Sequence, residues 1–152
     1  METITNLDKD TIGGVKSLIE INIDSSKGFE TAAENIENAD IAGYFRQCSA
    51  RRAQFAEQLK RIVDVNNVDV PDSGTARGSM HRWWLDLRGT VQNGEEHAVL
   101  AEAERGEDSI KHEYEDVLKK TAGSPLNAVL TDQYASVKET HDTIRDMRDA
   151  RA

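Results

Sequence analysis

The apolar residues of this chain recur at spacings of three, four and seven along most of its length, which is the period of an amphipathic helix. Four stretches show this pattern, and no stretch alternates long enough to predict a strand. The pattern therefore predicts an all-α protein with four long helices. The positions that form their apolar faces are Ile12, Val15, Ile19, Ile23, Phe29, Ala33 and Ile36; Ile41, Phe45, Cys48, Phe55, Leu59 and Ile62; Val99, Ala103, Ile110, Tyr114 and Val117; and Leu126, Leu130, Tyr134, Val137, Ile144 and Met147.

Turn-forming residues separate the four stretches. Thr5, followed three residues later by Asp8, resembles a capping box and predicts where the first helix starts. Residues 35–40 interrupt the pattern so briefly that the first two helices should form an antiparallel hairpin. Gly123–Pro125 offers a helix stop, an N-cap serine and a first-turn proline in succession.

A longer connection joins the second and third helices. From Asn66 to Gly78 it is rich in turn formers, and a short helix that closes at Gly89 is expected after this segment. A connection of this length can carry the chain back along the full height of a bundle, as it does in ferritin-like folds. We therefore expect one domain over residues 1–152, a ferritin-like four-helix bundle with a long crossover between helices 2 and 3. The apolar residues of the short helix are Met80, Trp83, Trp84 and Leu87.

Charge and composition narrow the possible partners. The net charge of −9 would repel nucleic acids and anionic lipid, so neither is an expected partner. The sequence contains no apolar run of membrane-spanning length and starts without a leader pattern, which favours a cytoplasmic protein. The single cysteine, Cys48, lies on an apolar face and is interpreted as a core residue, not a nucleophile.

Polar residues interrupt the apolar face of each predicted helix near its middle. They are Asn22 and Ser26 in the first helix, Arg52 in the second, Glu107 in the third and His141 in the fourth. A buried arginine needs a partner, and Glu107 is the natural one for Arg52, with Ser26 and His141 completing the hydrogen bonds. We therefore predict a buried polar network at mid-height of the bundle.

The alternative for the same positions is a metal centre. Di-iron proteins of ferritin-like fold use a Glu-x-x-His pair on each of two helices, and this chain contains no such pair. Glu104, Glu107 and His141 remain as candidate ligands, which is a poor set for two cations. The sequence thus predicts no metal, no other cofactor and no catalytic residue.

Two further features bear on partners. The acidic residues between Glu95 and Asp116 are spread around the third helix and are interpreted as a solvated face. Trp83 and Trp84 are adjacent on the short helix and cannot both point inward. One of them is a candidate for an interface with a partner or a second copy, or for the lining of a small-molecule site, although packing of both is an equal alternative.

Several segments together resemble a bacterial ferritin-like four-helix-bundle domain family of unknown function, found mainly in stress-tolerant and environmental bacteria. The chain departs from this family at Ser26, where a glutamate is common, and at Trp83, where a glycine is common. The resemblance implies the fold and a degenerate di-iron site, but no activity. The segments that carry it are Asp24–Ala33, Ala50–Leu59, His81–Leu87, Glu102–Asp108 with Tyr114, and Gln133–Asp142.

The resulting expectation is a bundle that acts by protein association, as a homo-oligomer or with another protein, in bacterial stress physiology. The alternative is an iron-binding oxidoreductase that uses a degenerate site. Fold likeness by itself is a weak basis for assigning function, so both remain open at this point.

Overall fold

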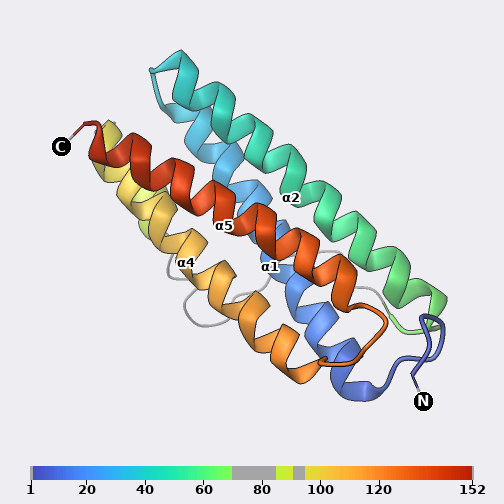
Figure 1. Ribbon diagram of the computed structural model, residues 1–152. Coiled ribbons are helices and arrows are strands. Elements are labelled where there is room, and N and C mark those ends of the chain that lie inside the picture. Colours follow the sequence, from blue (N-terminus) through green and yellow to red (C-terminus); the bar gives the residue numbers. More distant parts are fainter. Residues whose placement is uncertain (1, 70–84, 91–94, 152) are drawn as a thin grey trace.

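The computed structural model describes residues 2–69, 85–90 and 95–151. Its long helices are α1 (Lys9–Asn35), α2 (Ala39–Val65), α4 (Glu96–Lys120) and α5 (Asn127–Asp149), and residues 85–90 form a short helix before α4. The long helices lie side by side; α1 and α5 run in one direction and α2 and α4 in the other (Figure 1). The described part of the chain is all-helical, as predicted, apart from one isolated bridge near the N-terminus.

Polar caps set the start of the first two helices. Asp8 is the N-cap of α1, and its Oδ1 accepts a hydrogen bond of 2.9 Å from the amide of Thr11. The predicted start at Thr5 is therefore too early, because Asp8 caps the helix by itself. That hydrogen bond also lowers the pKa of the Asp8 carboxyl. Asn38 caps α2 in the same way, accepting from the amides of Asp40 and Ile41.

Gly123 and Ser124 form the turn between α4 and α5, but α5 starts later than the sequence predicts. Gly123 has a φ of 83°, a left-handed conformation that glycine adopts at little cost. Ser124 Oγ accepts from the amide of Leu126 at 3.2 Å, and this hydrogen bond closes the turn between the helices. Ser124 is therefore not the N-cap of α5. α5 begins only at Asn127.

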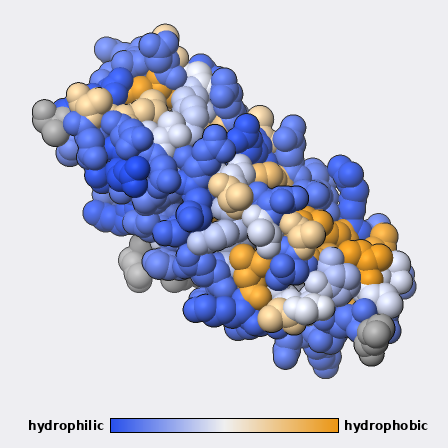
Figure 2. Space-filling view, viewed as in Figure 1, coloured by the Kyte–Doolittle hydropathy of each residue, from blue (hydrophilic) through white to orange (hydrophobic). Residues whose placement is uncertain are grey.

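The core is formed where the apolar faces of two hairpins meet. α1 packs mainly on α2, α4 packs on α5, and α1 also contacts α4. Leu87 of the short helix is fully buried, whereas Met80, Trp83 and Trp84 lie outside the described residues. The surface visible in Figure 2 is mostly hydrophilic, with apolar side chains gathered toward the end at which α2 terminates. None of the helices in the described ranges combines the length and the apolar character needed to cross a membrane.

Gly14 allows α1 and α4 to approach each other closely. A Cβ atom at this position would lie only 2.9 Å from Cγ1 of Val117. Val117 is buried and β-branched, so its side chain has little freedom to move away. The neighbouring Gly13 faces open space, since a Cβ there would meet nothing within 4 Å.

These two adjacent glycines should respond differently to alanine. We expect Gly13→Ala to raise the free energy of unfolding by about 0.5–1 kcal/mol, because glycine weakens a helix interior. Gly14→Ala should not raise the free energy of unfolding, because overpacking against Val117 costs about 1–3 kcal/mol and offsets the gain in helix stability. Urea titrations of both variants would measure the difference, and equal gains would contradict a close contact at Gly14.

Candidate functional site

A buried ion pair occupies the interior between α2 and α4. Arg52 of α2 donates from Nη1 to Oε1 of Glu107 at 2.7 Å and from Nη2 to Oε2 at 2.6 Å. The side chains of Arg52 and Glu107 are 1% and 0% exposed. This bidentate geometry matches the planar guanidinium to the carboxylate and makes the pair strong and directional.

Helix α1 completes the surroundings of Arg52. Ser25 Oγ accepts from Arg52 Nη1 at 3.2 Å, and the guanidinium carbon lies 5.7 Å from the centre of the Phe29 ring. Burial would lower the pKa of Arg52, but the charge and hydrogen bonds of Glu107 outweigh it and raise the pKa above its ordinary value. The guanidinium is therefore a permanent cation inside the protein.

Two residues predicted for this network lie elsewhere. Ser26 turns toward α2, where its Oγ donates to the carbonyl oxygen of Ser49 at 2.9 Å. Its predicted place is taken by Ser25, because the inward face of α1 runs through Asn22, Ser25 and Phe29 at spacings of three and four. His141 points to the outer edge of the interface between α4 and α5 and is paired with carboxylates there.

A second polar chain connects all four long helices. Asn22 Nδ2 donates to the hydroxyl of Tyr114, which donates to Oε1 of Gln133, each at 2.8 Å. Gln133 Nε2 then donates to Oε1 of Gln58 at 2.9 Å. Burial raises the pKa of Tyr114, so its hydroxyl keeps the proton that it donates. Gln133 could have been found from the sequence, since it lies on the apolar face between Leu130 and Val137.

The interior does not fit the dinuclear metal centre that a ferritin-like fold implies. Such a centre needs inward-facing carboxylates and histidines from several helices. Here a guanidinium lies between the helices and engages both oxygens of Glu107. A dication would be repelled by Arg52 and would have to displace it from its only charged partner in the described interior.

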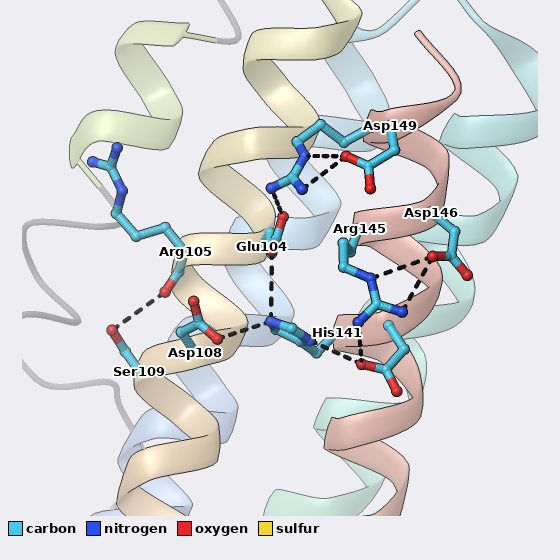
Figure 3. Close-up of polar contacts among 10 residues, drawn as sticks. Glu104, Arg105, Asp108, Ser109, His141, Arg145, Asp146 and Asp149 are labelled. Atoms are coloured by element: carbon cyan, nitrogen blue, oxygen red, sulfur yellow. Dashed lines mark hydrogen bonds and ion pairs between the residues drawn. The ribbon is translucent and has the colours of Figure 1, made fainter. Parts of the chain in front are cut away.

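A separate cluster of potential ligands lies at the edge between α4 and α5. Glu104, Asp108 and His141 each offer one ligand atom, and these atoms all lie within 4.8 Å of one another. His141 Nε2 is 2.8 Å from Oδ1 of Asp108 and 3.7 Å from Oε1 of Glu104 (Figure 3). Of the candidate ligands predicted from sequence, Glu104 and His141 come together, whereas Glu107 belongs to the buried pair.

Neighbouring residues orient this cluster. Asp142 Oδ1 lies 3.1 Å from Nδ1 of His141, and this hydrogen bond lowers the pKa of the Asp142 carboxyl. Arg148 binds the other carboxylate oxygen, Oε2, of Glu104. Asp108 was interpreted from the sequence as part of a solvated face, although its spacing of four from Glu104 already puts both on one side of α4.

Cys48 lies between α2 and α5 and is 5% exposed. It lines a small pocket together with Tyr44, Arg51 and Thr140. Burial raises the pKa of the thiol to about 11, which keeps it protonated and unreactive near neutral pH. These properties are those of a core residue, which is how the sequence was interpreted.

The buried pair should show strong energetic coupling. We expect Arg52→Met or Glu107→Leu alone to lower the free energy of unfolding by about 3–5 kcal/mol, because each leaves an uncompensated buried charge. The double variant should cost much less than the sum of the two, since it removes both charges together. Denaturant unfolding of the four proteins measures the coupling.

The ion pair of Lys60 and Glu57, 3.2 Å apart and partly exposed, provides the matched control. The same substitutions, Lys60→Met and Glu57→Leu, should show a coupling below about 1 kcal/mol, as exposed ion pairs do. Additive costs for Arg52 and Glu107 would contradict a tightly coupled buried pair.

Thiol labelling tests the environment of Cys48. A pKa of about 11 in place of 9.0 reduces the thiolate fraction at pH 8 about 100-fold, so native protein should react at least that much more slowly than unfolded protein. The rate should rise as pH approaches 11, because the reactive thiolate then forms. Glutathione in the same buffers serves as the control for the reagent. Equal rates for native and unfolded protein would show that the Cys48 thiol is accessible and that its pKa is not raised.

The chain is similar to a known protein family. Residues 10–120 match the model of a domain of unknown function, DUF2383, so the match includes α1, α2 and α4 but ends before α5. None of the curated proteins compared with the chain matches it. Because residues 10–120 make up more than half of the sequence, the chain belongs to the DUF2383 family of domains of unknown function.

Proposed function

We propose that this protein is a non-catalytic, ferritin-like helical bundle that acts by associating with protein, first of all with a second copy of itself. The parallel course of α2 and α4, joined by a long connection, supports the ferritin-like assignment (Figure 1). The role in bacterial stress physiology that the resemblance implies belongs to the same proposal.

The observation that carries the non-catalytic part is the ion pair of Arg52 and Glu107. It lies in the interior of the bundle, where ferritin-like oxidoreductases hold their metals, and both oxygens of the carboxylate are engaged by the guanidinium. The iron-binding oxidoreductase considered as the alternative would need this pair to open. An interior held closed by a desolvated ion pair favours a structural protein over a redox enzyme.

The short helix before α4 supports association. Leu87 points into the core, but Leu85 is 50% exposed, and Trp83 and Trp84 directly precede it in sequence. An exposed aliphatic side chain is common at interfaces, and aromatic residues are enriched in their composition. Homodimers are the commonest oligomers of soluble proteins, so a second copy is the first partner to test.

Light scattering coupled to size exclusion tests this proposal directly. We expect the untagged 16.9 kDa chain to elute as a dimer or larger oligomer, and Leu85→Glu to elute as a monomer, because a charge would be buried at the interface. Circular dichroism of the variant would establish that its helices are intact.

Val65→Glu is the matched control, because Val65 is also 50% exposed but lies at the end of α2. This variant should keep the mass of the unmodified chain. A chain that is monomeric across the micromolar range would refute self-association. Loss of the oligomer with Val65→Glu alone would place the interface at the other end of the bundle.

A further inference from the structure

We propose that Glu104, Asp108 and His141 bind one divalent transition-metal ion of the zinc type at the outer edge between α4 and α5. Imidazole and carboxylate donors together suit zinc and related first-row cations. The site is distinct from the bundle interior, and the proposal does not depend on the function proposed above. It would join α4 to α5 across their interface, because its ligands come from both helices.

The distances between the ligand atoms already fit a small cation. Zinc binds nitrogen and oxygen at about 2.0–2.2 Å, so tetrahedral ligand atoms lie about 3.4 Å from one another. The observed separations from Nε2 of His141, 2.8 Å to Asp108 and 3.7 Å to Glu104, bracket this value. Small side-chain adjustments would therefore be enough for the three atoms to surround one ion.

The contact between His141 and Asp142 prepares the imidazole as a ligand. When Nδ1 donates to Asp142, the lone pair of the neutral ring lies on Nε2 and faces Asp108 and Glu104 (Figure 3). Two acceptors only 2.8 Å apart repel each other unless a proton or a metal ion lies near them. A carboxylate behind the imidazole is also the usual support of metal-bound histidines in proteins.

Glu104 is positioned in a comparable way. Arg148 binds its Oε2, which leaves Oε1 directed toward His141. The side chains of Glu104 and His141 are 13% and 14% exposed, whereas that of Asp108 is 50% exposed. Two sheltered ligands and one accessible ligand make a site that an ion can enter from solvent, with water completing its coordination.

The experiment is a titration of untagged, chelator-treated protein with Zn²⁺ by calorimetry, and with Co²⁺ by visible absorption as a report on coordination geometry. We expect one ion per chain, a tetrahedral or five-coordinate cobalt spectrum, and a thermal midpoint that rises with zinc. His141→Ala and Asp108→Asn should abolish this binding. Asp142→Asn should weaken it roughly 10- to 100-fold, as loss of a supporting carboxylate does.

His112→Ala is the matched control. His112 also lies on α4 and contacts a carboxylate, Glu115, at 3.2 Å, but it is 73% exposed and belongs to no group of three ligands in the described residues. Its variant should bind zinc like the unmodified protein. The proposal is overturned by absence of saturable binding, by binding that survives His141→Ala, or by equal loss in His112→Ala. Circular dichroism of each variant distinguishes loss of the site from loss of the fold. Because Asp108 is half-exposed, its substitution is the least disruptive to folding.

Discussion

The guanidinium of Arg52 and the carboxylate of Glu107 are the two groups around which the rest of the bundle has to be arranged. Each is removed from water almost completely, and desolvation of an isolated charge costs several kcal/mol. Their bidentate contact offsets this cost only when α2 and α4 hold a fixed register and separation. Ser25 and Phe29 extend the same requirement to α1. The pair thus couples α4 to α1 and α2, which precede it in the sequence by a long connection.

The chain of hydrogen bonds from Asn22 through Tyr114 and Gln133 to Gln58 adds the fourth helix to this arrangement. Directional contacts are satisfied in only one packing, whereas apolar residues accept several, so these two polar layers favour a single alignment of the helices. The contact between Gly14 and Val117 adds to this, because α1 and α4 approach so closely there that an added Cβ would overlap with the valine. The polar contacts in the described interior are consequently specific to this packing of the four long helices.

Much of the candidate site could be predicted because a costly residue on an apolar face demands a partner. Arg52 and Glu107 were paired on this ground alone, and the structure brings them together. The prediction of Ser26 as a member of this network was wrong by one position, because Ser25 contacts Arg52 instead. Periodicity cannot say which of two adjacent serines faces inward until the helix is packed. His141 was wrong as a member of the interior network for a similar reason: it lies at the boundary of the apolar face of α5, where a small rotation decides between core and edge.

The sequence by itself determined the four long helices, the hairpin made by the first two, and the need for a partner at Arg52, because spacing and the cost of burying a charge are local properties of the chain. Only the tertiary structure decided which faces meet. It placed Asp108 beside His141, engaged Arg148 with Glu104 and turned Ser25 toward the guanidinium. Those contacts depend on how the packed helices are rotated and spaced relative to one another, and rotation and spacing follow from packing over the whole core at once.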